Sequence, residues 1–127
     1  MTLLVDTDVL IWHLRDHAQA THRLDGLSRL TISAVTEMEI LQGLRNRHEW
    51  QALRRMFERR SAQVMPLSAD ISAVALELMN SLTLSHGLQM ADALIAATAR
   101  VHGLAVLTGN VRHFSPVPLL AIEPFAI

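Results

Sequence analysis

Four acidic side chains occupy positions from which they could bind a metal ion or activate a water molecule. Two directly follow a short apolar run and the other two lie in later helical segments: Asp6, Asp8, Glu39 and Asp92. A carboxylate at the edge of a buried element is unfavourable unless a positive charge, several hydrogen-bond donors or a metal ion meets it. The sequence therefore has to supply a partner for these acids.

Each acid also has a structural interpretation. Asp8 fits the N-cap of the helix that we predict directly after it. Thr36 and Glu39 have the Ser/Thr-x-x-Glu spacing of a capping box, and on spacing alone this explains Glu39 better than a catalytic role does. Asp92 lies in a first helical turn, where the helix dipole favours an acid. One cap does not need two acids, so Asp6 remains unexplained, and Asp92 lies in a helix that is apolar on all sides.

A hard cation is the partner that best explains three acids at the starts of separate elements. Mg²⁺ prefers oxygen ligands and uses only a few carboxylates. The chain has no cysteine, and its seven histidines form no zinc pattern such as HExxH. All eleven basic residues are arginine, so no lysine can pair with the acids.

Short strands that alternate with helices position these acids. We predict strands at 3–5, 31–33, 64–67, 105–107 and 119–122, and helices at 9–15, 34–45, 49–60, 69–84 and 91–102. Ser68 is expected to cap the fourth helix and Gly103 to end the fifth. The alternation predicts an α/β fold with a mostly parallel central sheet and helices on both faces. Ligands bind at the carboxyl ends of strands in such sheets, and Asp6 lies at one of these ends.

The composition favours one compact domain of 127 residues. Half of the residues are apolar, the formal net charge is −1 and the mean hydropathy is +0.26. A small protein this apolar often buries surface in an oligomer or against a partner. No apolar run reaches the roughly 20 residues of a membrane span, and no signal peptide is visible. We therefore expect a cytoplasmic protein that does not contact a membrane.

Three segments, in their order and spacing, resemble PIN-domain ribonucleases, specifically the VapC-type toxins of bacterial toxin–antitoxin pairs. LLVDTDVLI resembles the opening strand and first acid of this family, SAVTEMEILQG its second motif, and ADALIAATARVHGLAVLTGNVRHF its third and fourth blocks. The family's second acid lies four residues before a glycine, here Gly43, which selects Glu39 over Glu37. The likeness covers nearly the whole chain, so residues 1–127 are expected to form one PIN domain, an α/β/α sandwich.

The resemblance implies an Mg²⁺-dependent RNA endonuclease, with Mn²⁺ as an acceptable substitute, that is usually dimeric and held inactive by a cognate antitoxin. Carried over by position, the catalytic residues are Asp6, Glu39 and Asp92, and Asp6 and Asp92 are the metal ligands. Further site residues are expected at three positions: Asp8, Thr108 and Asn110. The family often has a fourth acid in the block that contains Asn110 here. An amide carries no charge, so one bound ion is expected rather than two.

Two alternatives stay open at this point. The missing fourth acid is compatible with a catalytically weak PIN-like module that binds RNA or protein, although the first three acids are intact. Asp6 and Asp8 after a strand also resemble haloacid-dehalogenase-like phosphatases, but those usually depend on a lysine. Six arginines lie between residues 45 and 60. They could guide an RNA backbone, although a solvated helix face explains them equally well.

Overall fold

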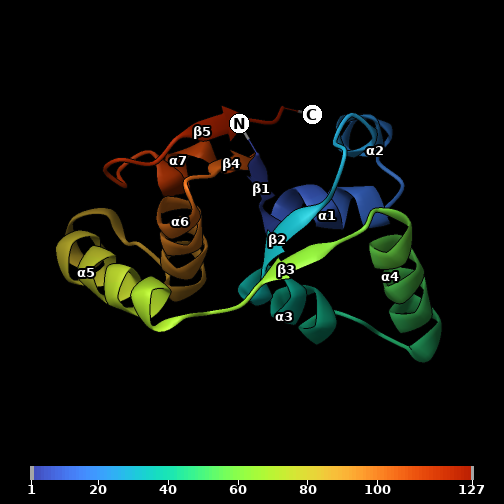
Figure 1. The fold of residues 1–127 in the computed structure, drawn as a ribbon, viewed down its shortest axis with the longest axis horizontal. Coiled ribbons are helices and arrows are strands. Elements are labelled where there is room, and N and C mark those ends of the chain that lie inside the picture. The colour runs from blue at the N-terminus through green and yellow to red at the C-terminus, as the bar shows by residue number, and fades with distance from the viewer. Residues whose placement is uncertain (1, 127) are drawn as a thin grey trace.

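The structure, a computed structural model, describes residues 2–126. Strands and helices alternate along most of the chain (Figure 1). The elements, in order, are β1 (Leu3–Val5), α1 (Thr7–Leu14), α2 (Ala18–Asp25), β2 (Thr31–Ser33), α3 (Ala34–Gln42), α4 (Arg47–Arg59), β3 (Gln63–Met65), α5 (Ala69–His86), α6 (Met90–His102), β4 (Ala105–Thr108), α7 (Val111–Phe114) and β5 (Ile122–Pro124).

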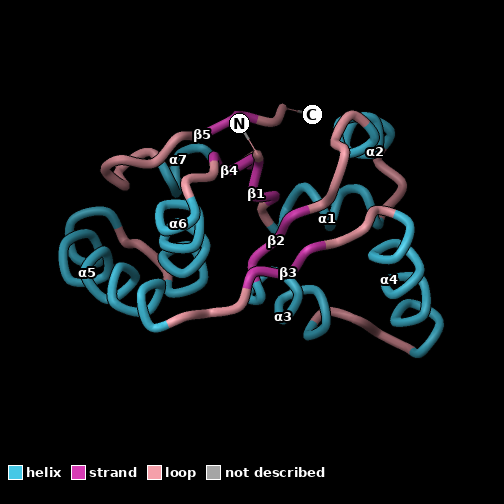
Figure 2. The backbone as a smooth tube through the Cα atoms, in the orientation of Figure 1, coloured by secondary structure: helices cyan, strands magenta, loops and turns pink. Residues whose placement is uncertain are grey.

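All paired strands of residues 2–126 run parallel, as predicted. β1 pairs with β4 and β4 with β5 in one group of three, while β2 pairs with β3 in a second group. β1 and β2 lie side by side where the two groups meet (Figure 2). The predicted central sheet is thus divided into two hydrogen-bonded parts, and the α/β fold class is confirmed.

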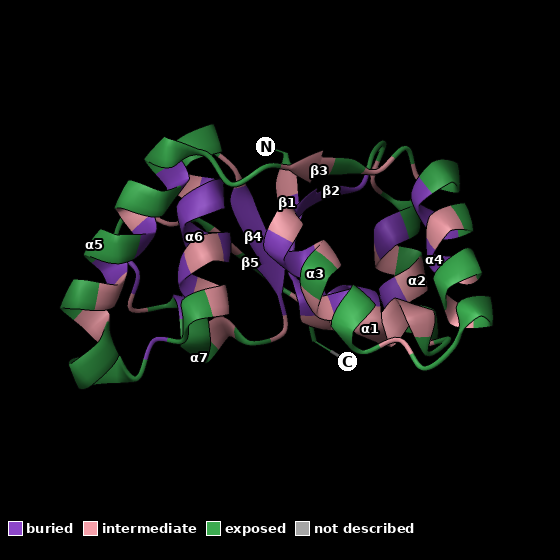
Figure 3. Cartoon of the chain, turned by 90° about the horizontal axis from the view of Figure 1, so that it is seen from below, coloured by how far each residue is buried: buried purple, intermediate pink, exposed green. Residues whose placement is uncertain are grey.

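Helices cover both faces of these strands, with α5 and α6 on one side and α1, α2 and α4 on the other (Figure 3). Successive strand residues point to opposite faces. Leu4 and Val106 therefore join the core under α5 and α6, whereas Val5 and Leu107 join the core under α1, α2 and α4. All four side chains are fully buried. The strands are apolar runs because both of their faces are covered.

The ends of the long helices follow the predicted signals. The Ser68 side chain accepts a hydrogen bond from the Ile71 backbone N–H and caps α5, and Gly103 ends α6 in the left-handed conformation with φ of 65°. Glycine adopts this conformation without steric penalty. Among residues 2–126, no helix combines the length and the apolar character that crossing a bilayer requires.

The C-terminal segment differs most from the predicted elements. The sequence analysis did not identify α7, a single helical turn that is held by the fully buried Phe114. The last strand covers Ile122–Pro124 rather than 119–122. Leu119 has φ of 60°, a left-handed conformation that cannot be part of a strand.

Candidate active site

Asp6 lies where β1 ends and is the N-cap of α1. Its Oδ1 accepts a hydrogen bond from the Thr7 backbone N–H at 2.8 Å, and its Oδ2 accepts one from the Thr108 hydroxyl at 2.7 Å. Asp6 is only 4% exposed, and Thr108 at the end of β4 is fully buried. Because β1 and β4 are parallel neighbours, their carboxyl ends bring together two residues that are 102 positions apart. Asp6 thus lies at the predicted edge.

The predicted N-cap role of Asp8 is wrong. α1 begins at Thr7, so Asp6 is the cap and Asp8 lies inside the first turn. Asp8 Oδ1 accepts from the Val9 backbone N–H at 2.7 Å, and Asp8 Oδ2 accepts from the Gly109 backbone N–H at 3.0 Å. The second bond joins the start of α1 to the loop after β4. The helix starts earlier than predicted because the residue that directly follows the apolar run already serves as its cap.

Gly109 is required where this loop passes α1. A Cβ atom at this position would lie 2.7 Å from the Trp12 ring and 2.9 Å from Asp8 Oδ2. Trp12 packs against Phe125 with ring centroids 5.6 Å apart, which limits its freedom to move away. We expect Gly109→Ala to lower the free energy of unfolding by about 1–3 kcal/mol through overpacking. Urea denaturation measures this, with Gly26→Ala as the control because its nearest neighbour is 3.5 Å away. Equal effects of the two changes would contradict the expectation.

Glu39 on α3 is linked to the start of α1 through hydroxyl groups. Thr7 Oγ1 lies 2.6 Å from Glu39 Oε1 and 3.0 Å from Thr36 Oγ1. Since a hydroxyl carries one proton and a carboxylate only accepts, Thr7 donates to Glu39 and accepts from Thr36. The predicted capping box is wrong. Ser33 is the N-cap of α3 and accepts from the Val35 N–H, so the carboxylate of Glu39 is not used as a cap.

Asp92 lies in the first turn of α6, as predicted, and is partly buried. Its Oδ2 lies 3.3 Å from Nδ1 of His113 on α7. The sequence analysis missed His113, because the proximity depends on a short helix that has no clear periodicity.

The other two predicted positions lie in the loop after β4. The Thr108 hydroxyl donates to Asp6 and accepts from the backbone N–H of Asn110 at 2.9 Å. Asn110 itself is exposed. Thr108 therefore contacts Asp6 with its side chain, whereas Asn110 takes part through its backbone.

The carboxylates raise one another's pKa values. Burial raises the pKa of Asp6 to about 6, with further contributions from the charges of Asp8 and Glu39. Burial also raises the pKa of Asp92, to which the charges of Asp6 and Glu39 add. The pKa of Asp8 is raised by burial and by the charge of Asp92, although hydrogen bonds from Gly109 and Val9 oppose this. Hence the four acids share one region of negative potential.

Comparison with known proteins identifies the family. Residues 3–118 match the family model described as PIN domain. The chain belongs to the PIN-domain family. This PIN domain is 37% identical over 134 aligned positions to Ribonuclease VapC10 of Mycobacterium tuberculosis, with 98% of this chain and 94% of the relative covered. It is 36% identical to Ribonuclease VapC19 of the same species over 91% of this chain and 94% of the relative. The resemblance to VapC-type PIN domains is thereby confirmed.

Solved structures show the same fold. A toxin–antitoxin complex from Klebsiella pneumoniae contains a chain with a TM-score of 0.81 and 27% identity, and each chain is covered completely. DNA-bound VapBC from Salmonella typhimurium contains one with a TM-score of 0.85 and 22% identity over 99% of both chains. Membership of the PIN-domain family rules out the haloacid-dehalogenase-like alternative.

The carboxylate oxygens of this PIN domain are suitable ligands for a hard divalent cation. Among residues 2–126, none of the four carboxylates pairs with an arginine, so their charge has no strong cationic partner. A bound cation would lower their pKa values and stabilise the ionised forms. No three acidic or histidine side chains in this range converge closely enough to hold an ion alone. Water and substrate oxygens would have to complete the coordination, as is usual for Mg²⁺.

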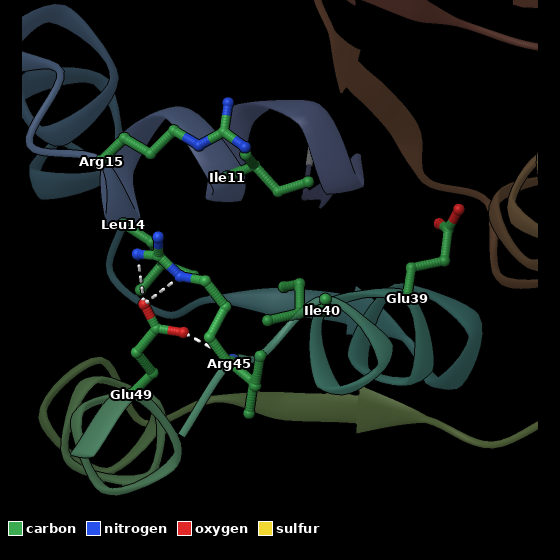
Figure 4. A pocket seen from close by; sticks show the side chains of 9 residues that line it. Ile11, Leu14, Arg15, Glu39, Ile40, Arg45 and Glu49 are labelled. Carbon is green, nitrogen blue, oxygen red and sulfur yellow. Dashed lines mark hydrogen bonds and ion pairs between the residues drawn. The ribbon is translucent and has the colours of Figure 1, made fainter. Parts of the chain in front are cut away.

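Two hollows flank the acids. The first, of about 460 Å³, lies between α1, α3 and the start of α4, with Glu39 among its lining residues (Figure 4). Its lining combines apolar side chains with charged ones: Ile11, Leu14, Ile40 and Leu44 with Arg15, Glu39, Arg45 and Glu49. The second hollow, of about 290 Å³, is lined on one side by Asp92. An extended ligand bound across the acids would thus contact the first hollow next to Glu39 and the second next to Asp92.

Proposed function

We propose that this PIN domain, residues 1–127, is an Mg²⁺-dependent RNA endonuclease and the toxin of a toxin–antitoxin pair. The observation that carries the proposal is the group of four carboxylates beside the carboxyl ends of β1 and β4, none of which pairs with an arginine among residues 2–126. Such a region suits a divalent ion that brings a phosphodiester to a water molecule. The relatives named ribonucleases support RNA as the substrate.

The proposed roles follow the contacts of each side chain. Asp6 and Asp92 hold the ion, and Glu39 orients the attacking water. When bound, the ion would neutralise developing charge on the phosphate and lower the pKa of a water molecule. Thr108 fixes the orientation of Asp6 through its 2.7 Å hydrogen bond, and Asp8 holds the loop after β4 in place.

An RNA cleavage assay tests this function. Purified protein with single-stranded RNA and Mg²⁺ should give products cut inside the strand, and Asp92→Asn should abolish them. The exposed amide of Asn110, in the block where the family resemblance implies a fourth acid, keeps the catalytically weak binding module as the second candidate. RNA binding without any cleavage in either Mg²⁺ or Mn²⁺ would favour that module.

Thr7 provides a finer test of the role of Glu39. Thr7→Val removes the hydroxyl that donates to Glu39 while keeping the size of the side chain. We expect kcat for RNA cleavage to fall about 10- to 100-fold, as for other residues that orient site ligands, with little change in KM. Thr7→Ser should retain most activity because it keeps the hydroxyl. Equal kcat values for the two variants would show that the hydroxyl does not orient Glu39.

We propose that the first hollow is the binding site of an antitoxin segment. Its apolar walls suit apolar side chains, and Glu39 at its edge suits a basic one (Figure 4). Neither arginine of this hollow compensates Glu39: Arg45 forms a 2.7 Å ion pair with Glu49, and Arg15 forms no ion pair among residues 2–126. The solved toxin–antitoxin complexes of similar fold support such a partner.

We also propose that this PIN domain forms a homodimer in the cytoplasm. Leu84 and Leu119 are almost completely exposed and Met90 is 70% exposed, so apolar surface remains available for a second copy. Sedimentation velocity at micromolar concentration should show a dimer. A single monomeric species under these conditions would contradict the proposal.

A further inference from the structure

The second hollow is lined by residues from three elements. Asp92 lines this hollow, whereas Glu39 lines the first. The end of α5 and the following loop contribute His86 and Gln89, the first turn of α6 contributes Asp92, and α7 contributes Arg112 and His113. α6 and α7 are in direct contact and lie together on the α5–α6 side of the strands (Figure 3). The hollow therefore opens directly beside one of the proposed metal ligands.

Four of the side chains that line this hollow can donate hydrogen bonds: His86, Gln89, Arg112 and His113. Arg112 is exposed and has no acidic partner among residues 2–126. In the first hollow Arg45 is engaged by two side-chain hydrogen bonds to Glu49, whereas Arg15 forms no ion pair among residues 2–126. Of these two hollows, the one with Arg112 is the one that Asp92 lines. His86 and Gln89 add further exposed polar groups. The guanidinium of Arg112 is thus an uncompensated positive charge next to an acidic centre.

An RNA strand that crosses this centre meets repulsion between its phosphates and the four carboxylates. A bound cation can offset this at the phosphate that is cut, but the neighbouring phosphates need their own positive partner. A planar guanidinium binds phosphate through two parallel hydrogen bonds. The volume of about 290 Å³ equals that of about ten water molecules, which is ample for one phosphate group.

We propose that this second hollow binds the RNA phosphate adjacent to the one that is cut, with Arg112 as the main contact and with His86 and Gln89 as additional donors. The proposal rests on the proposed ribonuclease function and adds to it a subsite on the Asp92 side. It gives the strand a defined path: one phosphate lies at the acids and the next at Arg112.

Two measurements on the full chain test the subsite. The first is binding of a fluorescently labelled single-stranded RNA to the Asp6→Asn protein in Mg²⁺, a background in which cleavage does not interfere. Adding Arg112→Ala should weaken binding about tenfold, the loss expected for one charge-assisted contact. It should also make the dependence of log K on log salt shallower by about 0.7. Arg29→Ala is the matched control, since Arg29 is exposed, has no acidic partner among residues 2–126 and lies near the start of β2, at the opposite end of the strands from the acids; it should change neither quantity.

The second measurement locates the phosphate. RNA substrates are made in which one phosphate at a time is replaced by an uncharged methylphosphonate, and KM is measured for wild type and Arg112→Ala. In wild type, replacement of one phosphate next to the cut should raise KM about tenfold. In Arg112→Ala the same replacement should have no further effect, because coupled groups are not additive.

The outcomes separate this subsite from the function on which it rests. If wild type cuts no RNA, the ribonuclease proposal fails, and the binding measurement still decides whether Arg112 contacts the strand. If wild type cuts RNA but Arg112→Ala binds like Arg29→Ala, the subsite is wrong while the function stands. Full additivity of the Arg112 and methylphosphonate effects at every position would equally overturn it.

Discussion

The Asp6→Asn variant is expected to lose RNA cleavage by more than about 100-fold and to unfold at a higher temperature than wild type in EDTA at pH 7. The loss of activity follows from the role proposed for the carboxylate. Stabilisation of charge by a bound ion contributes several kcal/mol to catalysis, and about 1.4 kcal/mol corresponds to a tenfold change in rate. The amide can still accept from the Thr7 N–H as an N-cap, so the start of α1 is preserved.

The gain in stability follows from the raised pKa of Asp6. Burial and the neighbouring acids raise this pKa to about 6, above its ordinary value near 4. The protonated form is therefore favoured in the folded protein, and the stability that this provides is complete below about pH 4 and lost as the pH rises through 6. At pH 7 the ionised group opposes folding by up to about 3 kcal/mol. The amide that replaces the carboxylate in the variant carries no charge and avoids this penalty.

Melting temperatures measured in EDTA between pH 4 and pH 8 test whether the ionised Asp6 destabilises the fold. The difference between Asp6→Asn and wild type should grow from pH 4 to pH 6 and then stay constant. Gln51→Ala, a change at an exposed residue of α4 that does not titrate, should show no such growth. A variant that is less stable than wild type at every pH would mean that the negative charge of Asp6 stabilises the fold, and the acidic site would then need another explanation.

Removal of divalent metal is the second change with a large expected effect. EDTA should stop RNA cleavage completely, and Mg²⁺ or Mn²⁺ should restore it. Metal should also stabilise the folded protein, because it binds the native cluster of carboxylates and not the unfolded chain. At an ion concentration one hundred times Kd the gain is about 2.7 kcal/mol.

Thermal melting with and without Mg²⁺ distinguishes a metal-binding role of the acids from a purely structural one. Wild type should melt higher in Mg²⁺, and Asp92→Asn should show a smaller gain. Glu58→Gln, at an exposed position on α4, should keep the full gain. Undiminished cleavage in EDTA, or wild type that does not respond to Mg²⁺, would rule out the metal mechanism.

The sequence was sufficient where a feature depends on neighbours along the chain. The apolar run before Asp6, the Ser68 cap and the Gly103 stop are local signals, and the structure agrees with each. The same local reasoning failed for Asp8 and for the pair of Thr36 and Glu39. Thr36 and Glu39 bond to Thr7 across the packing of α1 on α3, and Asp8 bonds to Gly109 in the loop after β4 in addition to the Val9 N–H of its own helix.

The hydrogen bond between Thr108 and Asp6 could not be predicted for a related reason. It depends on the register of β1 against β4, which places Leu3 opposite Ala105 and Val5 opposite Leu107. No spacing rule connects residues so far apart. The family resemblance grouped the acids into one site, whereas only the fold shows which hydroxyl or backbone group holds each one.

The pairing of β1 with β4 has a consequence for synthesis of the protein. Asp6 and Asp8 are held by Thr108 and Gly109, which leave the ribosome about one hundred residues later. A nascent chain therefore cannot assemble the proposed site until β4 and the loop after it have left the ribosome. An RNA-cutting enzyme built in this way is inert during synthesis of its first hundred residues, and it can become active only after β4 has emerged and paired with β1.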